Sequence, residues 1–553
     1  MKKIIIPILA ALGLFFTSCK KNTSDPAVPG TFSLVSYKVN EKSGGLSFYD
    51  INLLPTVKFS FSAPVNRTGV PANIYLSGNG ASSIPLNVSY ENNDSTVVVK
   101  PIAPLNNLTR YTGTVLTALE SVDHVSLGAG LNFTFLTSID STDKFPQISD
   151  SALLTLIQQQ TFKYFWDLGH PVSGMARERN SSGDLVTSGG TGFGLMSIPV
   201  AINRNFITRA AGLTRSLLIV NFLKNNCTRY HGAFSHWING TTGATIPFSS
   251  NDNGADLVET SYLMEGLLTA RQFFNSNSDV NEIALRNTIN QLWDGVEWNW
   301  FRQNNQNVLY WQWSPTLAWI INAQVSGWNE ALITYVMASS SRTDSIPKIA
   351  YDNGWAKNGN IRNGNSYFGY ILPLGPSNGG PMFFEHYSFL GINPVGLTDA
   401  YANYQVQTTN HTKINFEYCK ADPRNYFGYS NLCWGLTASD IPTGYAANEP
   451  NNDNGVIAPT AAVSSLPYTP AESMQAIRFF YYKLGDKLWG QYGFYDAFKL
   501  QDPWFATSTL AIDEGPIIIM IENYRTGLVW NLFTSAPEIK NGMKRLGFTA
   551  SYL

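Results

Sequence analysis

The period of the apolar positions along this chain changes once, near residue 140. From residue 31 to about 139, short runs alternate apolar and polar side chains, as in residues 56–61, 86–90, 96–99 and 133–136. Such an alternation is typical of half-buried β-strands, and turn-forming residues separate the runs. About seven such strands in about 110 residues predict a small all-β, immunoglobulin-like sandwich over residues 31–139.

Beyond residue 149 the apolar period becomes helical. Leu153, Leu154, Ile157 and Phe165 line one face of a helix that begins near residue 150, where Ser149 or Asp150 could cap it. Further helices are predicted at residues 191–203, 208–224, 255–275, 281–298, 316–340, 398–405, 471–484, 507–523 and 536–546. Residues 140–149 are then a linker and residues 150–553 a mainly α domain. The helix count is compatible with a closed double ring of helices, but it does not distinguish that ring from another all-α fold.

The first 30 residues carry a targeting pattern. Residues 1–19 have the layout of a secretory signal, because two lysines precede an apolar run that is too short to cross a bilayer. The small residues before Cys19 resemble a bacterial lipobox, although Phe16 stands where leucine is usual. We expect a lipid anchor at Cys19, a polar tether over residues 20–30 and a cell-envelope location, on the periplasmic face or the outer-membrane surface. Cleavage nearby, giving a free periplasmic protein, is the alternative.

The composition changes the picture in two ways. The net charge of −2 favours neither nucleic acid nor an anionic membrane surface as a partner. Aromatic residues make up 13% of the chain, and Trp and Tyr stack on sugar rings while their polar ends form hydrogen bonds, which favours a carbohydrate ligand. We expect a monomer. Three cysteines follow Cys19 without zinc-like spacing, so a Cys419–Cys433 disulfide and three buried thiols both remain open.

Residues 231–274 combine an aromatic, glycine-rich loop with the start of a clear helix. Asp252, Asp256 and Glu259 lie where the loop becomes the helix, at spacings that bring the three carboxylates to nearly one side. Clustered acids at an aromatic loop suit sugar binding and acid/base chemistry. They could equally stabilise the positive end of the helix, by about 0.3–1 kcal/mol each.

Three further places in the sequence meet the needs of glycoside hydrolysis, which uses one protonated acid and a second carboxylate. The acid should lie in an apolar pocket that raises its pKa. Glu330 follows Trp328, which with the nearby Trp319 offers an apolar wall. The other two are the Glu385-His386 pair before Tyr387, and the Asp513-Glu514 pair in apolar sequence. A helix-terminal glutamate, a hydrogen-bonded loop pair and a structural ion pair are the respective alternatives.

Other chemistries are less well supported by the sequence. The spacing of His231 and His236 matches no helical metal-binding pair, and we predict no metal and no cofactor. No nucleophile elbow or phosphate-binding loop is found. We expect His231, His236, Trp237, Trp328, Glu385, His386, Tyr387 and Glu514 to contact the sugar, with structural histidines as the alternative for the three His residues.

Several separate motifs together resemble one family. Residues 192–196, 231–271, 328–331, 379–387, 468–473 and 512–516 are similar to the bacterial "putative glucoamylase-like" domain, whose characterised members form glycoside hydrolase family 144, the β-1,2-glucanases. The segment before it resembles bacterial Ig-like modules. The family resemblance, over about residues 145–553, implies an (α/α)6 toroid that hydrolyses β-1,2-glucan with inversion of the anomeric centre. Endo-acting members release short sophorooligosaccharides, and exo-acting members release sophorose.

The resemblance also implies roles for particular residues. Glu330 matches the general acid, and Asp513 is the best match for the base, with Glu514 as its neighbour. Asp252, Asp256 and Glu259 match an acidic group in the substrate cleft, and Asp440 is a further candidate. The rival functions are a hydrolase of another glucan on the same fold and a non-catalytic, glycan-binding lipoprotein.

Overall fold

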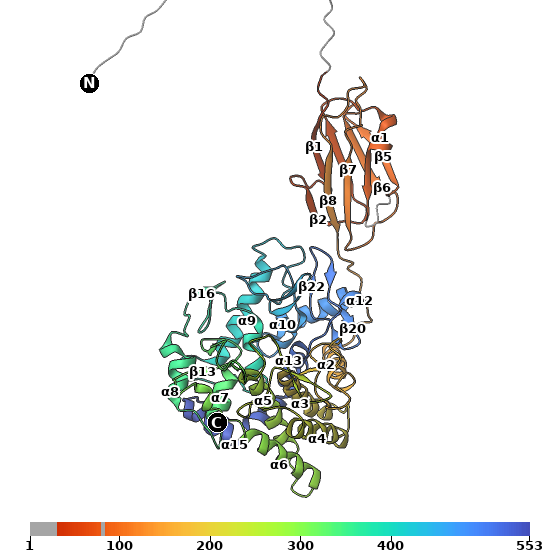
Figure 1. The fold of residues 1–553 in the computed structure, drawn as a ribbon. Helices are drawn as coiled ribbons and strands as arrows, with labels where there is room; N and C mark the ends of the chain where they lie inside the picture. Colours follow the sequence, from red (N-terminus) through yellow and green to blue (C-terminus); the bar gives the residue numbers. More distant parts are fainter. Residues whose placement is uncertain (1–29, 79–82) are drawn as a thin grey trace, which may run out of the picture. The chain divides into compact units, whose positions relative to one another are not determined.

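The computed structural model describes residues 30–78 and 83–553, which form two compact units divided in sequence between Ser138 and Ile139 (Figure 1). The signal peptide, Cys19 and nearly all of the predicted tether lie outside the described residues. Among the helices that are described, none is both long enough and apolar enough to cross a membrane.

The first unit is built from two four-stranded sheets. Their strand orders are β1-β3-β6-β5 and β2-β8-β7-β4, and within them only the β2–β8 pair is parallel. The strands are β1 Leu34–Val39, β2 Ser47–Ile51, β3 Val57–Phe61, β4 Ile74–Ser77, β5 Leu86–Glu91, β6 Thr96–Pro101, β7 Arg110–Val115 and β8 Leu131–Thr137, with a one-turn helix α1 at Val70–Asn73. The described part of this unit therefore has eight strands, one more than the alternation predicts.

The two sheets share one core. Val57 and Phe59 of β3 are fully buried and pair with Val99 and Val97 of β6, and Phe133 of β8 contributes from the other sheet. The intervening residues of β3 are partly exposed. This is the alternation on which the prediction of strands rested, and the strand-rich, Ig-like character of the region is confirmed.

The second unit is helix-rich. Its helices are α2 Asp150–Trp166, α3 Ser188–Asn203, α4 Arg209–Asn225, α5 Leu257–Phe273, α6 Val280–Asp294, α7 Leu332–Ser340, α8 Lys348–Ala350, α9 Tyr404–Ala421, α10 Pro459–Ser464, α11 Pro470–Arg478, α12 Leu484–Leu488, α13 Ala511–Thr526, α14 Leu528–Thr534 and α15 Pro537–Leu546. Short strands lie between them: β9 Leu185–Thr187, β10 Trp237–Asn239, β11 Thr245–Ile246, β12 Ala255–Asp256, β13 Leu309–Tyr310, β14 Gln312–Trp313, β15 Gln324–Val325, β16 Ser366–Tyr367, β17 Tyr370–Ile371, β18 Ala438–Ile441, β19 Gly444–Ala447, β20 Trp489–Gly490, β21 Gly493–Phe494, β22 Phe498–Lys499 and β23 Trp504–Phe505.

Helices α3, α5, α7 and α13 form the centre of this unit. Helix α3 packs against α5 and α13, and α5 packs against α7. Nearly every residue of these helices is buried, whichever side of the helix it is on, as expected of helices surrounded by protein. Gly192 and Gly266 let α3 and α5 approach closely, since a Cβ on either would lie 2.1 Å from a backbone oxygen of the other helix.

Two of the predicted helices are wrong in extent. Within residues 316–340 only α7 is helical, because Ala318, Asn322 and Gly327 adopt positive φ angles and turn the preceding chain into loops. Residues 398–403 are not helical either, and α9 starts after its cap Asn403 and runs to Ala421. This helix buries polar side chains such as Gln407, Thr408 and His411, so it leaves no apolar period to detect.

Smaller predictions have clear outcomes. Ser149 is confirmed as a cap of α2, since its side chain accepts a hydrogen bond from Ala152 N. The segment predicted as a linker lies along the π-helical turn Phe479–Lys483, where Lys144 N donates to Tyr482 O at 2.7 Å. Cys419 and Cys433 are separate, buried thiols, so the structure contains no disulfide between them.

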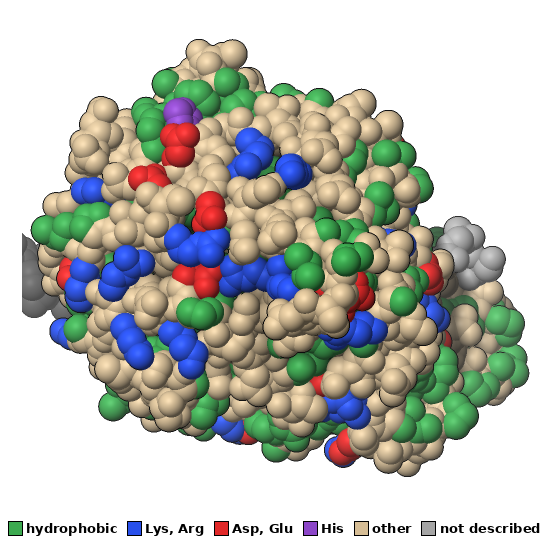
Figure 2. Space-filling model, turned by 90° about the horizontal axis from the view of Figure 1, so that it is seen from below, with side chains coloured by type: hydrophobic (Ala, Val, Ile, Leu, Met, Phe, Trp, Pro, Cys, Tyr) green, Lys and Arg blue, Asp and Glu red, His purple; other side chains and the backbone are tan. Residues whose placement is uncertain are grey.

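The surface mixes charges of both signs. Figure 2 shows one face of the molecule, on which Lys and Arg side chains lie beside Asp and Glu side chains on a mostly uncharged background. This mixture matches the near balance of 37 basic and 39 acidic residues in the sequence.

Candidate active site

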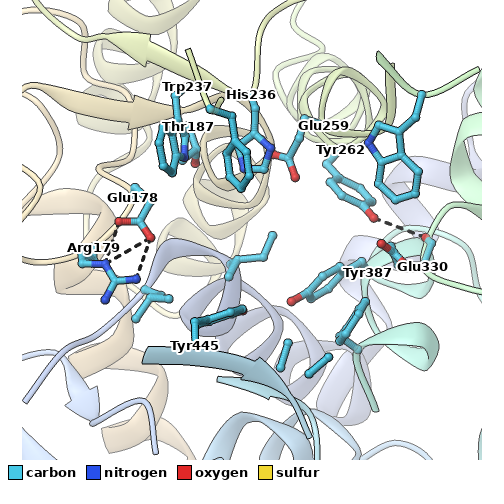
Figure 3. A pocket seen from close by; sticks show the side chains of 17 residues that line it. Glu178, Arg179, Thr187, His236, Trp237, Glu259, Tyr262, Glu330, Tyr387 and Tyr445 are labelled. Carbon is cyan, nitrogen blue, oxygen red and sulfur yellow. Dashed lines mark hydrogen bonds and ion pairs between the residues drawn. The ribbon is translucent and has the colours of Figure 1, made fainter. Parts of the chain in front are cut away.

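A cavity of about 460 Å³ opens at the ends of the central helices (Figure 3). Its wall is mainly aromatic and apolar, with a few carboxyl groups and one guanidinium. The lining residues are Glu178, Arg179, Thr187, His236, Trp237, Phe248, Glu259, Tyr262, Trp311, Glu330, Phe383, Tyr387, Ala438, Tyr445, Ala447, Leu510 and Ile512. Figure 3 shows Glu330 on the opposite side of the cavity from Glu178 and Arg179.

Glu330 occupies the turn just before α7. Its carbonyl oxygen accepts hydrogen bonds from Ser388 Oγ and, at 3.5 Å, from Tyr262 Oη. Ser388 Oγ also accepts the Ile333 N–H at 3.0 Å, which holds the start of α7 to the 3₁₀ turn Tyr387–Phe389. Burial raises the pKa of the Glu330 carboxyl to about 7, and the charges of Glu259 and Asp256 act in the same direction. Near neutral pH this carboxyl therefore still carries a proton in a large part of the molecules.

The acids at the start of α5 serve two purposes. Asp256 Oδ1 caps the helix by accepting the N–H groups of Val258 at 3.0 Å and Glu259 at 2.9 Å. The capping alternative is therefore confirmed for Asp256, which is 1% exposed. Glu259 reaches the cavity, and its Oε2 accepts the Gly189 N–H at 3.0 Å, which ties α5 to α3. Burial raises the pKa of Glu259 and raises that of Asp252 to about 6.

His236 is the cation of this group. Its Nδ1 lies 3.4 Å from Asp256 Oδ2. Burial by itself lowers the pKa of His236, but the carboxylates of Glu259, Asp256 and Asp252 outweigh that effect and raise it to about 9. A protonated His236 partly neutralises the three acids, and its ring packs on Phe248 at the cavity wall with 4.8 Å between ring centroids.

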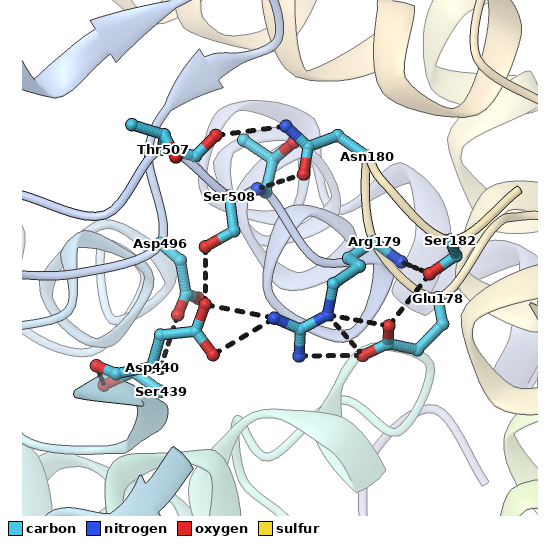
Figure 4. A network of polar contacts seen from close by, with 10 residues as sticks. Glu178, Arg179, Asn180, Ser182, Ser439, Asp440, Asp496, Thr507 and Ser508 are labelled. Atoms are coloured by element: carbon cyan, nitrogen blue, oxygen red, sulfur yellow. Dashed lines mark hydrogen bonds and ion pairs between the residues drawn. The ribbon is translucent and has the colours of Figure 1, made fainter. Parts of the chain in front are cut away.

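A polar network fixes the other side of the cavity (Figure 4). Arg179 Nε donates to Glu178 Oε2 at 2.8 Å, and its Nη1 donates to Asp440 Oδ2 at 3.2 Å. Asp440 also accepts Ser508 Oγ at 2.5 Å, while its own N–H donates to Asp496 Oδ2 at 2.6 Å. One guanidinium thus holds two carboxylates, and the β18–β19 hairpin that carries Asp440 also places Tyr445 in the cavity wall.

Asp513 extends this network from the first turn of α13. It is 4% exposed and lies close enough to Asp496, which is also 4% exposed, that the two carboxyls influence each other's pKa. Burial raises the pKa of both carboxyls, the charge of Asp496 raises that of Asp513 further, and the charge of Asp440 adds to the rise at Asp496, so at most one of the two is readily ionised. Tyr387 lies close enough to both Asp513 and Glu330 that each adds to the effect of burial in raising the pKa of its phenol.

Several predicted sugar contacts lie outside the cavity wall. Trp328 Nε1 donates to Glu385 Oε1 at 3.0 Å, and Glu385 also accepts His411 Nδ1 at 2.8 Å, so Trp328 is part of the core rather than the wall of Glu330. His386 pairs with Ser465 Oγ at 3.0 Å, and burial lowers its pKa to about 3, which makes it a neutral structural histidine. Glu514 is 2% exposed and near the Thr161 hydroxyl of α2, and burial raises the pKa of its carboxyl.

The remaining predicted contacts are divided. His236, Trp237 and Tyr387 are in the cavity wall, whereas His231 stacks on Trp300 elsewhere, with 3.4 Å between ring centroids. Functional candidates that the sequence pattern does not single out are Glu178, Arg179, Tyr262, Trp311, Tyr445 and Asp496. The only signal for the first two was an acid beside a base in a non-helical stretch. Within the described ranges, no group of three or more His, Cys, Asp or Glu side chains could hold a metal ion.

Two kinds of carboxyl therefore lie at the cavity and behind its wall. Glu330 carries a proton near neutral pH in an aromatic wall, whereas Asp496 and Asp513 are buried in a charged network and are not among the lining residues. Such a combination is suited to general acid and base catalysis at an acetal centre.

Comparison with known proteins agrees with this chemistry. A family model described as "Putative glucoamylase" matches residues 322–537, and one described as "Bacterial Ig-like domain" matches residues 48–137. A crystal structure titled as a putative glucoamylase from Bacteroides uniformis is 53% identical, with a TM-score of 0.73, and the match covers 74% of this chain and 100% of that one.

Two other relatives have been assigned more specific activities. An endo-β-1,2-glucanase from Chitinophaga pinensis, in complex with sophorotriose and glucose, is 48% identical with a TM-score of 0.72, over 74% of this chain and 100% of that one. An exo-β-1,2-glucooligosaccharide sophorohydrolase (non-reducing end) from Parabacteroides distasonis is 45% identical over 421 residues, which are 72% of this chain and 58% of that protein. The match thus spans little more than half of this last relative. The chain belongs to the "Putative glucoamylase" family, and it carries a bacterial Ig-like domain ahead of the family's domain.

Proposed function

We propose that this protein hydrolyses β-1,2-glucan to sophorose or short sophorooligosaccharides, as an inverting glycoside hydrolase of the family 144 type. The observation that carries the proposal is the proton held by Glu330 in the cavity, across from a carboxylate network. The 48% identity to an endo-β-1,2-glucanase and the 45% identity to a sophorohydrolase support the choice of substrate. Because the relatives include both types, endo and exo action remain alternatives.

In this proposal Glu330 gives its proton to the glycosidic oxygen as the bond from that oxygen to the anomeric carbon breaks. A water molecule attacks the same carbon from the opposite face, and its proton passes to the Asp496–Asp513 pair, with Asp513 as the base. The pair already carries one proton and one charge, so it can accept a second proton. Tyr387 lies between the two sides and can donate a hydrogen bond to the sugar.

We propose an (α/α)6 toroid as the architecture of the catalytic unit. Its support is the division between central helices buried on all sides, α3, α5, α7 and α13, and outer helices such as α4 and α6 that bury one face. In a double ring of helices the inner helices have this character, and the loops at one end of the ring form the substrate cleft.

The N-terminal pattern supports export and lipid anchoring at Cys19, with the enzyme acting as a monomer in the cell envelope. Metabolic labelling with a radioactive fatty acid tests the anchor. The label should enter the wild-type protein and be lost in a Cys19→Ser variant. Equal labelling of the two proteins would reject the anchor.

The substrate is tested by product analysis on linear β-1,2-glucan, with laminarin, cellulose oligosaccharides and starch alongside. Sophorose alone indicates exo action, and a ladder of sophorooligosaccharides indicates endo action. Glucose from starch, without products from β-1,2-glucan, would move the assignment to another glucan. Binding of β-1,2-glucan without any hydrolysis would favour a glycan-binding protein.

A further inference from the structure

The helical unit has a second hollow, apart from the catalytic cavity, beside the 3₁₀ turn Trp300–Arg302. Its volume is about 570 Å³, and it is lined by Glu297, Asn299, Trp300, Gln303, Asn304, Asn305, Trp319 and Asp344. The geometry points to a second sugar site, which binds glucosyl units of a neutral glucan outside the catalytic cavity. That the glucan is β-1,2-linked rests on the proposed function, but the class of ligand does not.

Stacked aromatic rings form one side of this hollow. Trp300 and Trp319 stack with 4.9 Å between ring centroids and 29° between planes. His231 lies flat on Trp300 at 3.4 Å and 10°, held there by a 2.9 Å contact between its Nδ1 and Glu297 Oε2. Both tryptophans are partly exposed although indole rings favour burial, and apolar ring faces beside polar groups are the usual means of binding a sugar ring.

The polar side of the hollow is held in place by a buried arginine. Arg302 is 8% exposed, and its guanidinium donates to Gln306 O at 2.7 Å, to Asn305 O at 2.8 Å and to Asn299 Oδ1 at 2.9 Å. Asp344 Oδ2 accepts the Asn299 N–H at 2.9 Å from the other side. These bonds fix the loop without using up the amides of Asn304 and Gln303. The buried Gln303 Oε1 accepts no hydrogen bond from any described residue.

The loop is maintained against a conformational cost. Gln303, Asn304 and Asn305 are three consecutive non-glycine residues with φ between 42° and 63°. His231 and Ala318, next to Trp319, also have positive φ angles. Non-glycine residues in this region cost about 1 kcal/mol or more each, and such residues gather where a ligand is bound.

The chemistry of the lining selects the ligand. It offers amide groups, two carboxylates and two indole rings, and it includes no Lys or Arg side chain. An anionic polymer would meet Glu297 and Asp344 without a compensating cation, whereas neutral hydroxyl groups can donate to both carboxylates. A neutral oligosaccharide therefore fits better than a charged one.

A line of aromatic residues leads from the catalytic cavity toward this site. Trp311 lines the cavity, and Trp313 lies two residues further along the chain, in β14, which pairs with β12 beside Asp256. The Trp313 ring meets Trp300 edge-on at 5.4 Å and His231 at 5.2 Å. A glucan that extends beyond the cavity would have aromatic contacts along this path, so the ligand is either the distal part of the bound chain or a separate chain.

Native electrophoresis in gels containing polymer tests the site. The catalytically inactive Glu330→Gln background prevents digestion, and the polymers are β-1,2-glucan, laminarin, hydroxyethyl cellulose and the acidic polymer polygalacturonate. Trp300→Ala and Trp319→Ala should each weaken retardation by a neutral glucan by roughly tenfold, as truncation of a central aromatic contact does. Trp300→Phe should recover part of the affinity. Trp489→Ala is the matched control, since this partly exposed tryptophan packs on Tyr481 and Phe494 and lines neither hollow.

Different results of this experiment support or overturn the second sugar site. Unchanged retardation of both alanine variants, with an unchanged circular dichroism spectrum, overturns the site, as does equal retardation by the acidic polymer. If Trp300→Ala does not fold, Trp319→Ala, which lies among exposed loop residues, decides. In the active background, a loss of kcat/KM that grows with substrate length indicates the distal part of the same chain, and a loss of polymer binding alone indicates a separate chain. Retardation by another neutral glucan, without hydrolysis of β-1,2-glucan, keeps the site but rejects the proposed function.

Discussion

The two sides of the catalytic cavity use the same functional group in opposite ways. Glu330 is a single carboxyl among aromatic side chains, and burial is the first cause of its raised pKa. On the other side, Arg179 holds the Asp440 carboxylate, the Asp440 N–H donates to Asp496, and the charge of Asp496 acts on Asp513. Isolation favours the neutral acid, whereas a shared network retains negative charge. In the proposed mechanism the environment of each carboxyl, rather than its residue type, therefore decides which is the proton donor and which the acceptor.

The contrast between the two sides of the cavity is tested most strongly by removing the proton of Glu330. Glu330→Gln keeps the shape of the side chain but has no acidic proton, so we expect the rate of β-1,2-glucan hydrolysis to fall by about 10³-fold or more. Release of reducing ends measures this rate. Glu417→Gln, which changes a partly exposed glutamate that pairs with Lys420 and lines neither hollow, is the control and should stay within about twofold. Full activity of Glu330→Gln would show that Glu330 is not the general acid.

We expect substitutions of different residues in the network to reduce activity by different amounts. Asp513→Asn removes the base itself, and we expect kcat to fall by about 10²–10³-fold. Asp440→Asn should cost less, about tenfold, because Asp440 acts through its contacts with Asp496 and Arg179. Kinetics of both variants on β-1,2-glucan measure the order. A larger loss for Asp440→Asn would make Asp440 the base.

We expect Arg179 to set the pH at which the Asp496–Asp513 pair becomes protonated. Its replacement in Arg179→Met leaves Asp440 without its cation, and the added negative charge raises the pKa of the Asp496–Asp513 pair. The base works unprotonated, so the acidic limb of the kcat/KM profile should move to higher pH by about 0.5–1 unit, with a loss of about 3- to 10-fold on that limb. Arg179→Lys keeps the charge and should move the limb less. If the acidic limb of Arg179→Met stays at the wild-type pH, Arg179 does not affect the pKa of the base.

The smallest expected effect is on stability. The pKa of Glu330 is raised to about 7 in the folded protein from an ordinary value of 4.5, so the folded state binds more protons than the unfolded state between these values. Folding is therefore less favourable as pH rises through this window. Glu330→Gln should melt about 1–3 °C above wild type at pH 8, and the difference should vanish below pH 4.5. A constant difference across this range would contradict the raised pKa.

Much of the fold could be predicted because its patterns are local. The alternation in β3 and the long buried face of α5 are visible in short windows of sequence. The π-helical and 3₁₀ turns and the helix α9 could not be found in this way. In α9 the buried side chains include Gln407 and His411, which are satisfied by partners such as Leu374 N and Glu385 Oε1 that only the fold provides.

The candidate site was predicted in part for the same reason. Glu330 and Asp513 carry recognisable surroundings in sequence, and both lie at the cavity or beside it. Trp328 stands two residues before Glu330, but its ring enters the core, since sequence proximity does not fix the direction of a side chain in a turn. Arg179 and Asp440 are 261 residues apart, and only the folded chain brings them together.

The pH dependence of kcat/KM on β-1,2-glucan tests the central claim most directly, because it reports the protonation states of the free enzyme. If Glu330 is the acid, activity falls as pH rises through about 7, the pKa of its carboxyl. Asp513→Asn should keep this alkaline limb at the same pH while it loses rate. An alkaline limb that appears only above about pH 9 would contradict the account, because it would place the proton donor on a group other than Glu330.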